Sequence, residues 1–244
     1  MANISFNDMD FSENNNFENS VGFFNLKEDG EEAVVRFVLD SVDDMEIYSV
    51  HTVKDGGKFK KFNCLRSPKE PTSKCPFCEK DAQVNKTDKS FAPSQKIYIK
   101  MLQYEPNGDG TYTPHAKIWE RSAYVYAPKL KNYIDTYGDL SNIVCKVVRN
   151  GRAGDMKTTY EIMPGINPSK FNEQTCPIDT SAFDNFKVMG TMIPDTTADD
   201  MYKYLGMNAS RTDESDFKDF QEAQRQYQET PQQNRSADAP IRRY

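Results

Sequence analysis

The sequence lacks the features that mark membrane-spanning and secreted proteins. No apolar run approaches the roughly 20 residues that a bilayer-spanning helix needs. The N-terminal stretch MANISFNDMDFSENNNF contains neither a basic start nor an apolar segment, so it does not resemble a signal peptide. The five cysteines are an odd number, which fits poorly with a secreted disulfide framework. These absences predict a cytoplasmic protein that does not associate with membranes.

Apolar residues are also scarce, at 37% of 244 residues, which predicts one moderate core with polar extensions. Residues 1–20 are acidic and asparagine-rich, without hydrophobic periodicity, and are predicted to be flexible. The polar, glutamine-rich residues 207–244 are predicted to form a mostly flexible tail, and residues 21–206 the core. Phe217, Phe220 and Tyr227 have helix-like spacing in the tail and could dock a partner or pack on the core.

Charge is distributed unevenly along the chain, although the net charge is only -6. Residues 1–50 carry 2 basic and 12 acidic side chains, whereas residues 51–170 carry 21 basic and 12 acidic ones. Residues 171–244 carry 8 basic and 13 acidic side chains. A basic middle between acidic ends is typical of a core that binds a polyanion, although a solvated lysine-rich surface would give the same pattern.

Short β-like runs dominate the middle of the chain and predict a small, mainly β antiparallel barrel or sandwich. One hairpin is predicted around KDGG, residues 54–57, because Asp-Gly favours tight turns between strands. A proline start and a glycine end predict a helix over 128–138, and a second short helix is expected within 194–206. The strands are predicted at 32–39, 45–53, 58–64, 96–104, 116–126, 142–149 and 157–163.

A Cys-x2-Cys pair, Cys75 and Cys78, stands in the segment KCPFCEK. Glutaredoxin-like enzymes use such a pair where a strand leads into a helix of an α/β fold. Here a loop-like segment, SPKEPTS, precedes Cys75, and no strand-helix-strand pattern follows. Zinc deaminases need a glutamate two residues after the histidine, but Val53 occupies that position after His51. Redox chemistry therefore stays the weaker alternative, and deaminase chemistry is excluded.

Two further donors complete a metal-binding set. His51 lies in the first arm of the predicted hairpin and Cys64 ends the second, so the hairpin can bring both toward Cys75 and Cys78. One imidazole and three thiolates form a common donor set for tetrahedral zinc. Because protein donors fill all four positions, the sequence predicts a closed, structural site for one zinc ion, in a subdomain of about residues 45–90. Three free cysteines near a histidine are the alternative, and His115 is a less favoured ligand because it lies far along the sequence.

Aromatic residues alternate with cations in two of the predicted strands. Strand periodicity places Lys96, Tyr98 and Lys100 on one face, opposite Ile97 and Ile99. In the next strand it places Lys117, Trp119 and Arg121 together. Rings can stack on unpaired bases while cations hold phosphates, so these residues predict a single-strand-binding cleft, extended by Lys58, Lys60, Lys61 and Phe62. Burial of Tyr98 and Trp119 beneath another segment is the alternative.

The order and spacing of His51, Cys64, Cys75 and Cys78, within a basic and aromatic β-rich region of about residues 30–165, resemble the zinc-containing single-stranded DNA-binding proteins of tailed bacteriophages, the T-even helix-destabilising protein family. The resemblance implies an OB-fold core joined to a zinc subdomain. It also implies a protein that coats single-stranded DNA during replication, recombination and repair, without catalysis, in the host cytoplasm.

Both ends of the chain depart from that family. The first 26 residues contain no lysine or arginine, so the family's basic arm for self-association is missing. Residues 211–244 carry seven acids and six bases rather than a strongly acidic tail that recruits replication or recombination proteins. A zinc-ribbon transcription or assembly factor that binds a polymerase remains the alternative function.

Overall fold

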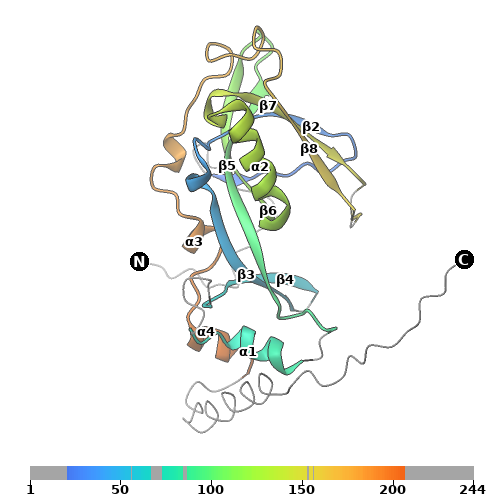
Figure 1. Ribbon diagram of the computed structural model, residues 1–244, viewed down its shortest axis with the longest axis vertical. Helices are drawn as coiled ribbons and strands as arrows, with labels where there is room; N and C mark the ends of the chain where they lie inside the picture. Colours follow the sequence, from blue (N-terminus) through green and yellow to red (C-terminus); the bar gives the residue numbers. More distant parts are fainter. Residues whose placement is uncertain are drawn as a thin grey trace, which may run out of the picture. The chain divides into compact units, whose positions relative to one another are not determined.

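The computed structural model describes residues 21–55, 57–66, 73–84, 87–152, 154–155 and 157–206 (Figure 1). The chain divides into two compact units, one that extends to Thr196 and one that begins at Thr197. The predictions for residues 1–20, for most of the loop between Cys64 and Cys75, and for the tail with Phe217, Phe220 and Tyr227 lie outside the described residues.

The first unit is mainly β, as predicted. Its strands are β1 (Gly22–Phe23), β2 (Glu32–Phe37), β3 (Glu46–Asp55), β4 (Lys58–Asn63), β5 (Pro93–Pro106), β6 (Tyr112–Ser122), β7 (Val144–Asn150) and β8 (Thr159–Pro164). They form one open mixed sheet in the order β1-β6-β5-β2-β7-β8, and β3 joins it by pairing with both β5 and β4. Only β1 and β6 are parallel among the strand pairs of the described residues.

Strand β5 connects the two ends of this sheet (Figure 1). Its first half pairs with β3, from Pro93 opposite His51 to Tyr98 opposite Glu46. Its second half pairs with β2, and β6 runs along nearly its whole length. The hairpin β3-β4 is thereby attached to the main part of the sheet through β5.

The predicted hairpin at KDGG is confirmed. Asp55 pairs with Lys58, so only two glycine positions connect the strands. Gly57 has a φ of +90°, a backbone conformation that costs free energy for any residue with a Cβ. The glycine is therefore required by the tight turn that aligns β4 with β3.

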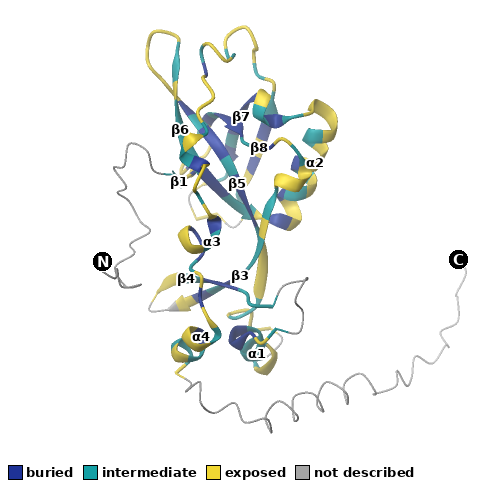
Figure 2. Ribbon diagram, turned by 90° about the vertical axis from the view of Figure 1, so that its left-hand side faces the viewer, coloured by how far each residue is buried: buried dark blue, intermediate teal, exposed yellow. Residues whose placement is uncertain are grey.

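The two faces of the sheet are both buried, as Figure 2 shows by the dark colour that runs along much of β5. Alternate residues of β5 and its neighbours point into a core that includes Val35, Phe37, Ile99, Trp119 and Cys145. We call this side the inner face. The opposite, outer face presents a second apolar cluster, which includes Tyr98, Leu102, Tyr104 and Ile118.

Helix α2 (Ala123–Tyr137) covers the inner face with its buried residues Ala123, Tyr126 and Leu130. It begins five residues before the predicted start, so the predicted strand over 116–126 ends at Ser122. Pro128, which suggested a helix start, lies within the helix. Burial of Ala123 and Tyr126 stabilises the turn that precedes this proline, and such packing outweighs local propensity.

A long segment after β8, residues 166–193, packs on the outer face, and we call it the strap. It contains η4 (Ser181–Phe183) and α3 (Val188–Thr191), and its apolar residues join the outer cluster. The backbone carbonyl of Cys176 accepts hydrogen bonds from the buried side chains of Arg36 and Tyr104, each at 3.4 Å. Tyr112 donates its backbone N–H to the carbonyl of Thr175 at 2.8 Å. These contacts hold the strap against β2, β5 and β6.

The remaining helices are short. They are η2 (Val42–Asp44), α1 (Pro76–Gln83), η3 (Leu140–Asn142) and, in the second unit, α4 (Ala198–Tyr204). Helix α4 confirms the short helix expected within 194–206, and Thr197 and Asp200 form a capping box at its start. In the described residues, no helix combines the length and the apolar character needed to cross a membrane.

Candidate metal centre

Four side chains that are far apart in the sequence converge beside the β3-β4 hairpin. The ligand atoms of His51, Cys64, Cys75 and Cys78 all lie within 4.8 Å of one another. The Nε2 atom of His51 is 3.3 Å from the sulfur of Cys75 and 3.7 Å from that of Cys78. The Cys64 sulfur is 3.5 Å from Cys78 and 4.0 Å from Cys75. These sulfur separations are far longer than a disulfide bond of about 2 Å, and all three cysteines are free.

Local structure places each of these donors. His51 lies opposite Phe62 in the β3-β4 ladder, and Cys64 follows directly after β4. The backbone N–H of Cys64 donates to the carbonyl of Ser49 at 2.8 Å, which continues the pairing past the end of the strand. Cys75 is the N-cap of α1, with Pro76 at the first helical position, where its missing N–H removes no helical hydrogen bond. One turn of helix then brings Cys78 back toward Cys75.

The orientation of the His51 ring is fixed by a backbone contact. Its Nδ1 atom lies 2.6 Å from the carbonyl oxygen of Phe91, which can only accept a hydrogen bond. In the neutral, metal-binding form of the ring the proton therefore sits on Nδ1, and the lone pair of Nε2 is available to a metal ion held among the three sulfurs. Metal-binding histidines generally have such a partner on the second nitrogen.

Three phenylalanines enclose the centre. Phe77, which is fully buried, packs against His51, Phe62 and Phe91, with ring centroids 5.4, 4.8 and 6.0 Å apart respectively. His51 and Cys75 are also fully buried. This apolar packing shields His51 and Cys75 from water, whereas Cys64 and Cys78 are partly exposed.

The crowding of the donors shifts their pKa values. Burial acts to lower the pKa of His51, but hydrogen bonds to the Cys64 and Cys75 sulfurs outweigh it and raise the pKa to about 9. Hydrogen bonds from Cys64 and Cys78 lower the pKa of Cys75, whereas contacts with Cys64 and Cys75 raise that of Cys78. Three thiolates in so small a space repel one another, and a bound cation would offset this repulsion.

The predicted donor set is thus brought together as expected, and it could hold a metal ion. The other histidine, His115, lies on β6, where its Nε2 atom is 3.4 Å from a carboxylate oxygen of Glu105. Cys145 is buried in the inner core, and Cys176, which belongs to the strap, is buried in the outer cluster.

The predicted exposure of the stacking rings Tyr98 and Trp119 is wrong. The alternation is correct, because Tyr98 and Trp119 stand on opposite sides of the sheet from Ile97 and Ile118 respectively. However, Tyr98 is only 2% exposed and Trp119 is fully buried. Tyr98 lies in the outer cluster with the strap, and Trp119 lies in the inner core. Neither ring is accessible to a base, so the alternative of burial is correct for both.

Other residues of the predicted cleft are also engaged in the fold. Phe62 is 3% exposed because Phe77 covers it. The Arg121 guanidinium lies over the rings of Trp119 and Tyr160, at 4.7 and 4.0 Å from their centroids. Lys100 forms an ion pair of 2.6 Å with Glu46. Lys60, Lys96 and Lys117 are partly buried. Among the residues predicted to contact DNA, only Lys58 is exposed.

Sequence reasoning missed Phe59, a ring that is 69% exposed on β4. Strand periodicity contained the necessary signal. Because Phe62 shares the metal side of the hairpin with His51, Phe59 and Lys61 must point to the opposite side. The role of the Phe91 carbonyl had no comparable signal, because any residue can supply a backbone oxygen.

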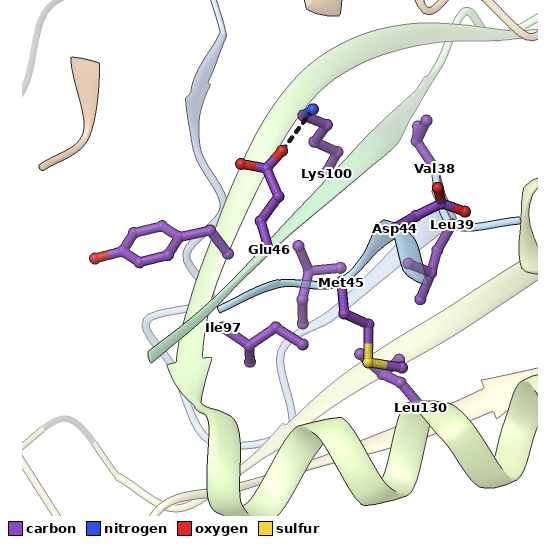
Figure 3. Close-up of a pocket in the computed structure, with 10 residues that line it drawn as sticks. Val38, Leu39, Asp44, Met45, Glu46, Ile97, Lys100 and Leu130 are labelled. Carbon is purple, nitrogen blue, oxygen red and sulfur yellow. Dashed lines mark ion pairs between the residues drawn. The ribbon is translucent and has the colours of Figure 1, made fainter. Parts of the chain in front are cut away.

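A small pocket lies between η2, β5 and α2 (Figure 3). Its volume is about 10 Å³, which is room for about one water molecule. The ion pair between Glu46 and Lys100 borders it on one side, and Ile97, Met45 and Leu130 border it on the other. The pocket is too small for a substrate or a nucleotide.

Comparison with known proteins adds no assignment: the chain matches no protein-family model and no curated protein.

Proposed function

We propose that the protein binds single-stranded DNA without sequence preference and that a structural zinc ion supports the binding region. The observation that carries this proposal is the attachment of the His51, Cys64, Cys75 and Cys78 centre to a lysine-rich hairpin. Strand β4 has the sequence KFKKFN, pairs with the strand that carries His51, and leads directly to Cys64. A metal at this place fixes the cationic hairpin relative to β5.

The donor chemistry supports zinc. Zn–S bonds of about 2.3 Å and Zn–N bonds of about 2.0 Å in a tetrahedron place sulfurs about 3.8 Å apart and sulfur and nitrogen about 3.5 Å apart. The separations of 3.5 and 4.0 Å between sulfurs, and of 3.3 and 3.7 Å between sulfur and His51 Nε2, fit this geometry. Thiolate-rich sets select soft or borderline metals over magnesium and calcium.

The same donor set supports a structural rather than a catalytic ion. Catalytic zinc sites keep one position for water or substrate, whereas structural sites take four protein ligands. Here four protein donors converge on one point, and Phe62, Phe77 and Phe91 surround them. The metal would hold the chain in place and would not activate a substrate.

The strand order supports an OB-type core. An OB fold is a partly open, five-stranded Greek-key barrel. Five strands here lie in the order β6-β5-β2-β7-β8, with α2 between β6 and β7 along the chain. The first and last strands of this set, β6 and β8, contribute rings that meet in the core: the centroids of Trp119 and Tyr160 are 5.3 Å apart. Such folds commonly bind oligonucleotides.

Single strands fit the charge arrangement better than duplex DNA does. Duplex readers commonly insert a basic helix into the major groove. The only lysines of α2 are both engaged: Lys129 donates to the carbonyl of Tyr160 at 3.1 Å, and Lys131 pairs with Asp135 at 2.6 Å. The exposed Lys54 and Lys58 lie instead on the β3-β4 hairpin. The resemblance to the phage proteins adds roles in DNA replication, recombination and repair, and contact with partner proteins through the C-terminal segment.

Fluorescence anisotropy of labelled oligo-dT tests this function. We expect the full chain to bind oligo-dT more tightly than a duplex of equal length, and binding should weaken as salt rises because counterions are released from the strand. Equal affinity for duplex, or a preference for duplex, would favour a zinc-ribbon factor instead. Disulfide exchange that Cys75→Ser abolishes would favour redox chemistry.

A further inference from the structure

In the part of the chain that the structure describes, the sheet carries an exposed surface that is both aromatic and cationic. We propose that unpaired bases stack on Phe59 and Phe23, which Lys61 connects, and that Lys54 holds an adjacent phosphate. This inference rests on the proposed function and assigns its binding residues. We call Phe59, Lys61 and Phe23 the stacking row.

Because both faces of the sheet are largely covered, single-stranded DNA is directed to the stacking row. The outer face of β5 and β6 would offer the largest surface, but the strap covers it through Phe183, Met192 and Ile193. The inner face is filled by the core and α2. A strand of DNA that follows the sheet therefore reaches accessible rings on the β3-β4 hairpin and at the nearby edge strand β1.

The two rings of the row are unusually accessible. Phe59 is 69% exposed and Phe23 is 39% exposed. A single exposed phenylalanine needs no explanation, because isolated apolar side chains are common on protein surfaces. Two such rings that share a cation are more specific. The Nζ atom of Lys61 lies 5.6 Å from the centroid of Phe23, and Lys61 and Phe59 stand two residues apart on one side of β4.

The position of Lys61 is set by Glu120 of β6, with which it forms an ion pair. This contact links β4 to β6, the strand that pairs with β1. Glu120 therefore holds the hairpin side and the β1 side of the row together. It also neutralises Lys61, so this lysine spaces the rings rather than binding phosphate.

Phosphate contact falls to Lys54, an exposed lysine beside the turn of the hairpin. Lys54 lies directly opposite Phe59 in the β3-β4 ladder, so their side chains share one side. Lys58, which is also exposed, precedes Phe59 on β4 and therefore points to the opposite side of the hairpin, whereas Lys61 shares the side of Phe59. A ring flanked by cations is the arrangement by which proteins hold single strands of any sequence, with bases on rings and phosphates on ammonium groups.

The test compares Phe59→Ala with two matched variants of the full chain. Phe59→Trp retains a stacking ring, and Tyr124→Ala removes a ring that is 89% exposed on α2, away from the row. All proteins are checked for equal metal content and thermal unfolding, and affinity is measured with labelled oligo-dT. Loss of one stacked base predicts about 5- to 150-fold weaker binding for Phe59→Ala. Phe59→Trp and Tyr124→Ala should bind within about twofold of the wild type, and the new tryptophan should be quenched by oligo-dT.

The outcomes separate this inference from the function on which it rests. If the unaltered chain fails to bind oligo-dT, the proposed function itself is wrong. If the unaltered chain binds and Phe59→Ala binds equally well, the function stands and the stacking row is overturned. An equal loss in Tyr124→Ala would also overturn it, because the strand would then contact α2.

Discussion

Trp119 is enclosed by the rings of Phe24, Phe37, Tyr126 and Tyr160, whose centroids lie 5.3 to 6.4 Å from its own. We expect Trp119→Ala to lower the free energy of unfolding by about 3–5 kcal/mol, because a large cavity opens in the core. Urea denaturation measures this loss. The same burial predicts that oligo-dT leaves the tryptophan emission of the unaltered chain nearly unchanged. Strong quenching on binding would contradict the burial of this ring.

At the candidate metal centre, each of the three cysteines would supply one of the four ligands. Cys64→Ser should reduce bound zinc well below one ion per chain and lower the unfolding temperature, because metal-binding free energy contributes directly to folding. Metal analysis by mass spectrometry and thermal unfolding measure both effects. Cys145→Ala is the matched control, since this thiol lies in the inner core away from the centre. Full zinc content in Cys64→Ser would show that the ligand assignment is wrong.

Among the elements, the β3-β4 hairpin connects the metal centre to the exposed lysines, and its turn depends on Gly57. Among the described residues, no heavy atom other than those of the two chain neighbours lies within 4 Å of the position that a Cβ at Gly57 would occupy, so the main cost of a substitution is the backbone conformation at φ +90°. Gly57→Ala should therefore destabilise the protein by about 1–2 kcal/mol. Gly57→Asn should cost less, because asparagine tolerates positive φ better. Chemical denaturation compares the two, and equal stability of all three proteins would contradict the turn geometry.

Over the whole molecule, local patterns predicted the elements and the metal donors well. The Cys75-Cys78 pair, the glycine turn and the alternation of β5 are short-range signals, and the structure agrees with each. Exposure was harder to predict. Tyr98 reads as a surface residue between two lysines, but it packs against Tyr48 and lies in one apolar cluster with the strap, which begins more than 60 residues later. Trp119 is buried because its strand faces α2, and sequence alternation alone does not identify the covered face.

The central claim is that a metal held by His51, Cys64, Cys75 and Cys78 braces a hairpin that binds unpaired DNA. The most direct test is the affinity of the full chain for labelled oligo-dT before chelation, after chelation and after zinc is restored. We predict binding in the first state, at least about tenfold weaker binding in the second, and recovery in the third. An affinity that stays the same in all three states would contradict the claim.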